Sequence, residues 1–322
     1  MRMDSLEKEE TKKSPGDLSI VFMGTPEFAV ASLDALVKAG FRIVAVVTAP
    51  DKPAGRGLKL SESAVKKYAT TAGLKVLQPA KLKDPGFISE LSALQADLQV
   101  IVAFRMLPEV IWNMPPLGTI NLHGSLLPQY RGAAPINWAV INGEKETGVT
   151  TFRLKHEIDT GNILLQESFP IGDDETAGEV HDRMKETGAA LLVKTVQGIA
   201  RNELQEIPQP AHTAQDGLKH APKIFTGTAK INWELGVDQV YNLIRGLSPY
   251  PAAFTFLNDK MLKIFKAEKQ KSNHAAVPST FDTDGKTYLR FAANDGYISV
   301  KELQLEGKKK MQVEEFLRGM RW

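Results

Sequence analysis

The 322-residue sequence contains no cysteine. This absence excludes disulfides, thiolate nucleophiles and cysteine metal sites; it also fits a reducing compartment, and we expect a cytoplasmic location. Long apolar runs are missing too, because segments such as 43–49 fall far short of the ~20 residues that a membrane-spanning helix needs. Residues 1–17 mix charges of both signs without an apolar core, which predicts a mobile tail and not a signal peptide.

Several catalytic motifs are also absent. The turn after the first apolar strand has the single glycine Gly24 and does not match G-x-G-x-x-G, so a dinucleotide cofactor is poorly supported. There is no G-x-S-x-G, and without cysteine no activated serine or cysteine nucleophile can be assigned. The six histidines show no i, i+4 pair or other ligand spacing, which argues against a metal site. Direct transfer of a group between two substrates is the chemistry that remains.

Apolar segments alternate with amphipathic ones through the first two thirds of the chain. Residues 18–23 and 41–48 are near-continuous apolar strands on either side of a helix, which is typical of parallel strands covered on both faces. Further strands are expected at 75–77, 98–104, 117–122, 148–154 and 163–167, and helices at 62–71, 85–94, 136–141 and 175–200. The pattern predicts an α/β fold with a Rossmann-like, open, mostly parallel sheet and helices on both faces.

The pattern changes after residue 204. Residues 205–223 include prolines and few side chains that could pack, which predicts a linker. Beyond it, short β segments separated by turn signals such as 258–259 and 282–285 predict a small OB-like β-barrel. We therefore expect a mobile tail at 1–17, a catalytic domain at 18–204, a linker at 205–223 and a C-terminal OB-like domain at 224–322.

The net charge of +2 is unevenly distributed along the chain. From residue 206 to the end there are 17 Lys and Arg against 13 Asp and Glu, a surplus of +4, whereas the remainder has 23 against 25, or −2. The C-terminal third is therefore the basic part. This surplus is either a solvated surface or the electrostatic footprint of a polyanion such as a nucleic acid.

Three polar side chains are candidates for a reaction site. In the strand that ends at the segment 121–128, Asn121 and His123 are two residues apart and therefore point to one face, with Leu122 pointing to the other. Asp159 lies in an Asp-Thr-Gly turn between two strands. One interpretation is structural: Asn121 and His123 satisfy each other, and Asp159 bonds its own backbone. The other is group transfer, with His123 handling a proton, Asn121 donating to an oxyanion and Asp159 orienting or receiving charge.

Six segments, taken together and in order, resemble the bacterial methionyl-tRNA formyltransferases: FMGTPEFAVASL, DKPAGRG, NLHGSLLPQYRGAAPI, ETGVTTF, IDTGNIL and LIRGLSPYPAAF. The match runs from residue 18 to the end and leaves out only the tail. HGSLLP and DTG are shared by all transferases and hydrolases that depend on 10-formyltetrahydrofolate, so they indicate the superfamily and not the acceptor. The basic loop at 52–57 separates this family from its relatives. The residue pattern of the 52–57 loop, taken without the resemblance, predicts an ordinary surface loop.

The resemblance implies a reaction and a set of residues. A formyl group would pass from 10-formyltetrahydrofolate, a co-substrate, to the α-amine of methionyl initiator tRNA, with no metal and no tightly bound cofactor; a monomer is expected. The implied catalytic residues are Asn121, His123 and Asp159. The implied folate contacts are Ser125, Leu126, Leu127, Pro128, Phe104, Arg105, Met106 and Ile158. The implied tRNA contacts are Lys52, Arg56 and Lys59. The family usually has Tyr-Gly where this chain has Phe104 and Arg105, a change at the expected pterin contacts.

Two other enzymes would share the catalytic residues. A formyltransferase that acts on an amino-sugar nucleotide is expected to continue into a dehydrogenase domain. A 10-formyltetrahydrofolate hydrolase would not need the basic loop at 52–57. A non-enzymatic RNA-binding protein with a decayed transferase domain would lack part of the catalytic set, and Asn121, His123 and Asp159 are all present. The acceptor therefore distinguishes these interpretations, and the sequence favours tRNA.

Overall fold

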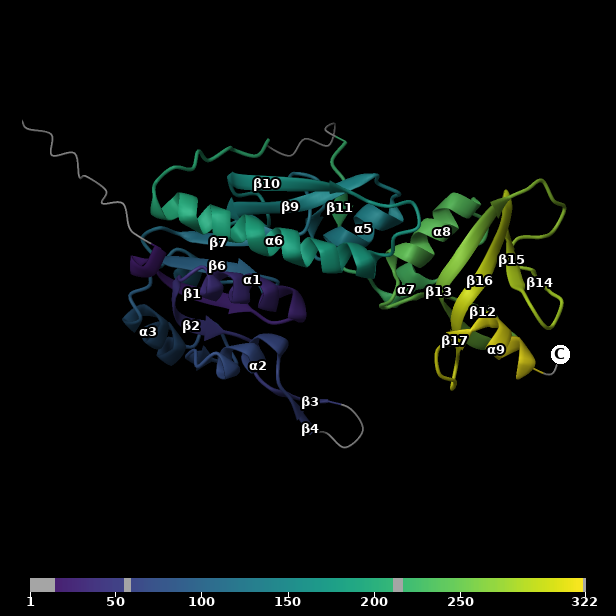
Figure 1. Cartoon of the computed structure of the whole chain (residues 1–322), viewed down its shortest axis with the longest axis horizontal. Helices are drawn as coiled ribbons and strands as arrows, with labels where there is room; N and C mark the ends of the chain where they lie inside the picture. The colour runs from purple at the N-terminus through teal and green to yellow at the C-terminus, as the bar shows by residue number, and fades with distance from the viewer. Residues whose placement is uncertain (1–14, 55–58, 211–216, 321–322) are drawn as a thin grey trace, which may run out of the picture. The chain divides into compact units, whose positions relative to one another are not determined.

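The computed structural model describes residues 15–54, 59–210 and 217–320 (Figure 1). The chain divides into two compact units: the first comprises Met1–His123, Val149–Glu167 and Lys185–Pro210, and the second comprises Gly124–Gly148, Ser168–Met184 and Ala211–Trp322. Most of the expected tail lies outside the described residues, and Pro15–Asp17 form a short 3-10 helix. The domain boundaries expected from the sequence stay a prediction.

The first unit is built on a seven-stranded sheet in the order β10-β9-β7-β6-β1-β2-β5. Its strands are β1 (Ser19–Gly24), β2 (Arg42–Val47), β5 (Val76–Leu77), β6 (Leu98–Val102), β7 (Thr119–His123), β9 (Glu146–Arg153) and β10 (Ile163–Pro170). Neighbours from β5 to β7 pair in parallel, and β9 is antiparallel to β7. The mostly parallel α/β sheet is confirmed. All residues of β1 and β6 are buried, as strands covered on both faces should be.

Helices cover both faces of this sheet. They are α1 (Glu27–Lys38), α2 (Ala64–Thr71), α3 (Pro85–Ala93), α4 (Glu109–Trp112) and α6 (Ala177–Ala200). On one face, Phe87 of α3 and Ile111 of α4 join a buried apolar cluster with Ile101 of β6. On the other face, Gly188 of α6 lies so close to Leu122 of β7 that a Cβ would be 2.9 Å from the Leu122 Cδ2 atom.

A short antiparallel hairpin, β3 (Lys52–Ala54) and β4 (Lys59–Ser61), lies between β2 and α2. Its base is held by Asp51, which forms an ion pair with Lys66 of α2 and accepts a hydrogen bond of 2.8 Å from the side-chain amide of Gln78. The Lys66 ammonium, followed by the Gln78 amide, keeps the pKa of Asp51 below its ordinary value. The base of the hairpin is therefore tied to α2 by an ion pair, in addition to its backbone connections.

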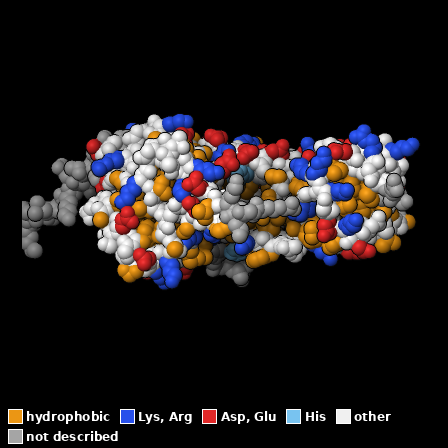
Figure 2. Space-filling model, turned by 90° about the horizontal axis from the view of Figure 1, so that it is seen from below, with side chains coloured by type: hydrophobic (Ala, Val, Ile, Leu, Met, Phe, Trp, Pro, Cys, Tyr) orange, Lys and Arg blue, Asp and Glu red, His pale blue; other side chains and the backbone are white. Residues whose placement is uncertain are grey.

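The surface carries charges of both signs. On the face drawn in Figure 2, Lys and Arg side chains lie among Asp and Glu side chains. Within the described parts of the chain, no helix has the length and apolar character to cross a membrane.

The second unit contains an antiparallel sheet of six strands, in the order β12-β13-β16-β15-β14, with β17 paired to β16. The strands are β12 (Ala253–Leu257), β13 (Lys260–Lys271), β14 (Phe281–Thr283), β15 (Leu289–Ala293), β16 (Gly296–Leu305) and β17 (Met311–Gln312). The helices are α5 (Pro135–Ile141), α7 (Thr226–Ala229), α8 (Val237–Gly246) and α9 (Val313–Arg318); β8 (Arg131–Gly132) pairs in parallel with β11 (His220–Ala221).

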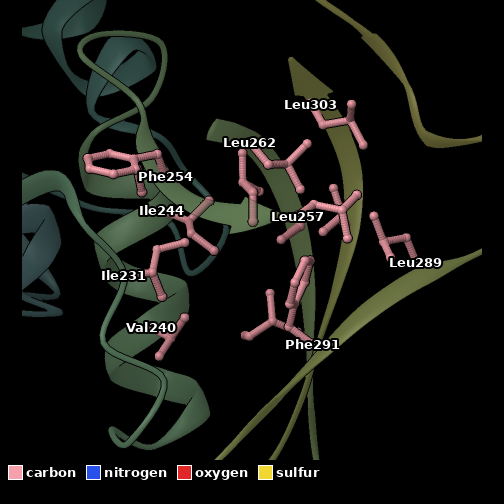
Figure 3. Packing of buried hydrophobic residues seen from close by; sticks show 14 of the residues in the cluster. Ile231, Val240, Ile244, Phe254, Leu257, Leu262, Leu289, Phe291 and Leu303 are labelled. Carbon is pink, nitrogen blue, oxygen red and sulfur yellow. The ribbon is translucent and has the colours of Figure 1, made fainter. Parts of the chain in front are cut away.

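The core of this sheet forms where α8 packs on it. Ile244 of α8, Leu262 of β13 and Phe291 of β15 belong to one buried apolar cluster, and Figure 3 shows their side chains gathered between the helix and the strands. The turn pattern predicts a small OB-like β-barrel beyond residue 223, and the short β segments there form an antiparallel sheet of the half-barrel kind.

Candidate active site

Strand β7 presents two of the candidate catalytic residues. Asn121 lies opposite Ile101 of β6 and Phe152 of β9, and His123 lies opposite Thr150 of β9. Ile101 belongs to the cluster under α3 and α4, so Asn121 and His123 share that face. Leu122 faces α6, as the contact with Gly188 shows. The alternation expected from the sequence is therefore confirmed, and the strand extends one residue further than expected, through His123.

The imidazole of His123 is buried, with only 7% of the residue exposed. The ring of Phe152 meets it edge-on, at a centroid distance of 6.5 Å and an interplanar angle of 85°. The Nδ1 atom of His123 is 3.9 Å from Oδ2 of Asp159, whose side chain is 12% exposed. That distance is too long for a hydrogen bond but short enough for an electrostatic interaction with little solvent screening. The structure thus brings His123 and Asp159 together.

Asp159 is presented by a tight turn whose geometry explains the Asp-Thr-Gly sequence. Asp159 has a positive φ of 54°, a left-handed conformation that Asp tolerates better than most residues. The Thr160 hydroxyl donates to the carbonyl of Glu157 at 3.1 Å. At Gly161, a Cβ would lie 1.5 Å from the carbonyl oxygen of Arg153, so any side chain would overlap β9. The glycine therefore allows the turn to lie directly against the strand.

Four of the expected folate contacts belong to the same unit. Phe104 packs against the apolar cluster under α3 and α4, whereas Met106 and Ile158 are 73% and 59% exposed. The Arg105 guanidinium donates to the carbonyls of Pro79 and Ala80. Arg105, where the family usually has Gly, therefore stabilises the neighbouring loop at Pro79 and Ala80 by hydrogen bonds to the loop backbone.

The other expected folate contacts follow His123 and Gly124 in the chain and belong to the second unit. Ser125 and Leu127 are buried, and the Ser125 hydroxyl donates to the carbonyl of Gln129 at 2.6 Å. Leu126 and Pro128 are partly exposed. The buried pair therefore stabilises the loop, and the partly exposed pair offers side chains at its surface.

The expected tRNA contacts are on the hairpin. Lys52 is in β3 and Lys59 is in β4, on opposite strands; Arg56 lies outside the described residues. Among the residues that the structure describes, no group of three or more His, Cys, Asp or Glu side chains could hold a metal ion.

The sequence interpretation missed a set of contacts at 206–209. The amide of Gln209 donates to the carbonyls of Asp159 and Gly161, at 3.0 and 2.7 Å. The carboxylate of Glu206 accepts from Asn162 and from the guanidinium of Arg153, both at 2.9 Å. These residues follow no helical or strand periodicity, and nothing in the sequence indicates their partners.

Profiles of two protein domains match the chain: formyl transferase at residues 18–196 and formyl transferase, C-terminal domain, at residues 223–321. The chain is 53% identical to the methionyl-tRNA formyltransferase of Bacteroides fragilis over 308 residues, which cover 94% of this chain and 95% of that protein. It is 55% identical to the methionyl-tRNA formyltransferase of Phocaeicola vulgatus over 312 residues, 95% of this chain and 96% of that protein.

Solved structures share the fold at lower identity. The N-formyltransferase from Helicobacter canadensis, crystallised with folinic acid and dTDP-3-aminofucose, is 22% identical with a TM-score of 0.67, covering 91% of this chain and 100% of that one. HypX from Aquifex aeolicus in complex with tetrahydrofolic acid is 17% identical with a TM-score of 0.63, covering 94% of this chain and 48% of that one.

Proposed function

Because the chain belongs to the formyltransferase family, and within it to the methionyl-tRNA formyltransferases, we propose that it moves a formyl group from 10-formyltetrahydrofolate to the α-amine of methionyl initiator tRNA. The site proposed for this reaction is Asn121, His123 and Asp159. The observation that carries the assignment is the approach of the His123 and Asp159 side chains to 3.9 Å, with Asn121 on the same face of β7 as His123.

The central step is attack of the methionyl amine on the formyl carbon, which is attached to N10 of the folate. The new N–C bond converts the carbonyl oxygen into an oxyanion. In this proposal the Asn121 amide and a protonated His123 donate hydrogen bonds to that oxygen. One such donor typically lowers the barrier by about 3–4 kcal/mol, because it meets charge that develops only in the transition state.

Two proton movements complete the transfer. The attacking amine must lose a proton, and N10 must gain one as its bond to the formyl carbon breaks. Asp159 accepts the amine proton, directly or through a water molecule, and the proton that N10 gains comes from the protonated His123 or from a water molecule. The folate then leaves as tetrahydrofolate. It enters and leaves as a co-substrate, and no step of this proposal needs a metal or a tightly bound cofactor.

Exposed apolar side chains support a folate site beside these residues. Ile158 immediately precedes Asp159, and the turn that carries both approaches α4, where His156 Nδ1 is 4.0 Å from Glu109 Oε2. Met106 and Ile158 each expose an apolar side chain, the kind of surface that a flat aromatic ring can cover. For Ser125, Leu126, Leu127 and Pro128, which belong to the second unit, a folate contact is proposed from the family resemblance alone.

The acceptor is proposed from relatives and from charge. The methionyl-tRNA formyltransferases are more than twice as similar to this chain as the Helicobacter enzyme crystallised with an amino-sugar nucleotide, 53% against 22% identity. The hairpin residues Lys52, Arg56 and Lys59 and the +4 surplus from residue 206 onward fit a polyanionic acceptor. A monomeric state and a cytoplasmic location stay predictions.

The test is a competition between acceptors. Labelled 10-formyltetrahydrofolate is incubated with the protein and Met-tRNA, amino-sugar nucleotides, or water alone. We expect label on Met-tRNA. Preferential labelling of the amino sugar, or release of labelled formate without transfer, would replace the proposed function by one of the two alternatives.

A further inference from the structure

A stretch of chain far from the catalytic residues in sequence lies along the Asp159 turn. Residues 206–209, here called the 206–209 segment, pair with the start of β10: the backbone N–H of each of Ile163 and Ile207 donates to the carbonyl of the other at 2.8 Å. This antiparallel bridge fixes the segment next to the turn. The side chains on either side of Ile207 can therefore reach the turn from a defined position.

Gln209 is the first of these side chains. A primary amide has two N–H donors, and Gln209 directs them to the carbonyls of Asp159 and Gly161. These two carbonyls flank Thr160 in the part of the turn with the left-handed residue. Left-handed backbone costs about 1–2 kcal/mol and persists where its surroundings hold it. The two hydrogen bonds from Gln209 stabilise the turn on both sides of Thr160.

Glu206 is the second. Its carboxylate joins Asn162, at the end of the turn, to Arg153, at the end of β9. Burial raises the pKa of Glu206, but the hydrogen bonds from Asn162 and Arg153 outweigh that effect, and its pKa lies below the ordinary value. The hydrogen bonds from Asn162 and Arg153 therefore favour the charged form of the carboxylate.

The same network reaches the strand that carries the other two catalytic residues. The Arg153 guanidinium also donates to the carbonyl of Leu117, two residues before β7 begins. Glu206 thus connects, through Arg153, to the entry of the strand with Asn121 and His123. Through Asn162 it connects to the turn with Asp159. A displacement at either end would change the 3.9 Å separation of His123 and Asp159.

We propose that the 206–209 segment sets the position of the Asp159 carboxylate relative to His123, with Gln209 and Glu206 as positioning residues for formyl transfer. This inference rests on the proposed function, because it takes Asp159 as the proton acceptor. Gln209 acts through the backbone of the turn, by its hydrogen bonds to the carbonyls of Asp159 and Gly161.

The first experiment replaces Gln209 by Glu, which has the same shape but presents no N–H donor and repels the two carbonyls. We expect kcat for formylation of Met-tRNA to fall about 10- to 100-fold, because small displacements of reacting groups cost this much. The KM value for tRNA should stay within about two-fold. The matched control is Gln205→Ala, an exposed residue of the same stretch, which should behave as wild type.

The second experiment distinguishes positioning from a general loss of structure. The acidic limb of the pH profile of kcat/KM is measured for wild type, Gln209→Ala, Asp159→Asn and the double variant. Gln209→Ala should shift that limb. The double variant should be no slower than Asp159→Asn alone, because a residue that acts through Asp159 has nothing left to act on.

Two results would overturn the inference: a wild-type pH profile in Gln209→Ala, or additive losses in the double variant. A Gln209 variant as fast as wild type, beside a severely impaired Asp159→Asn, would reject the positioning role and leave the proposed function standing. Full activity of Asp159→Asn itself would reject the catalytic assignment first. Thermal unfolding of each variant shows whether it is folded.

Discussion

At the scale of single residues, the site combines groups that are held in different ways. Asn121 and His123 are fixed by neighbouring strands on both sides of β7. Asp159 is fixed by a turn that depends on Gly161 and on the amide of Gln209. Strand residues keep their direction when one side chain is changed, because the ladder of backbone hydrogen bonds remains. Substitutions on β7 should therefore report on chemistry more than on folding.

We expect His123→Ala and Asn121→Ala each to lower kcat by about 100-fold or more, because each removes a donor to the oxyanion. His123 is buried, so its variant should also lose some stability, whereas the partly exposed Asn121 should lose little. Single-turnover formylation of Met-tRNA and thermal unfolding measure the two effects. Near-wild-type turnover in either variant would show that its assigned role is wrong.

At the scale of elements, strands and turns differ in what the sequence predicts. The position of Asn121 and His123 on one face follows from period-two alternation, and the Asp-Thr-Gly turn from its residue types. The contacts of Glu206 and Gln209 do not follow from any pattern, because they join residues about 50 positions apart through side chains of no periodic register. Local rules predict elements, and long-range side-chain hydrogen bonds have no local sequence signal.

The turn itself gives a stability prediction. Gly161→Ala would place a Cβ 1.5 Å from the carbonyl oxygen of Arg153, so the turn must move away from β9. We expect a loss of about 1–3 kcal/mol in the free energy of unfolding, the usual cost of overpacking, together with a large loss of turnover. Gly227→Ala is the control, since a Cβ there has no neighbour within 4 Å among the described residues. Equal denaturation midpoints for the two variants would contradict the prediction.

The hairpin gives a prediction about the acceptor. The family resemblance implies that Arg56 contacts tRNA. Its guanidinium carries N–H donors in a planar arrangement that matches phosphates or base edges. Arg56→Leu should reduce kcat/KM for Met-tRNA and leave folate affinity unchanged, whereas Arg56→Lys should recover only part of the loss. Steady-state kinetics at varied tRNA concentration measure the change in kcat/KM, and a folate titration measures the affinity for folate. Full activity of Arg56→Leu on initiator tRNA would make the loop a simple surface connection.

At the scale of the whole molecule, charge distribution gives a prediction about affinity. The overall charge is only +2, and Lys and Arg lie among Asp and Glu on the face drawn in Figure 2, so no large field of one sign is expected. The surplus of +4 from residue 206 onward should still act through local contacts with phosphates. We expect the affinity for tRNA to fall as salt rises, because each phosphate contact releases a counterion. Binding measured between low and moderate ionic strength tests this, and a flat dependence would remove the polyanion interpretation.

The 206–209 segment also affects how chimaeras of these enzymes should be made. Residues 197–222 lie between the two domain profiles. This interval is an obvious place to join the N-terminal part of one enzyme to the C-terminal part of another. A crossover before residue 206 would bring in the donor's residues at positions 206 and 209 and separate them from Arg153, Asn162 and the Asp159 turn of the host. A crossover after residue 210 keeps these partners from one parent. Chimaeras joined at the later point should retain the turnover of the parent that supplies β7.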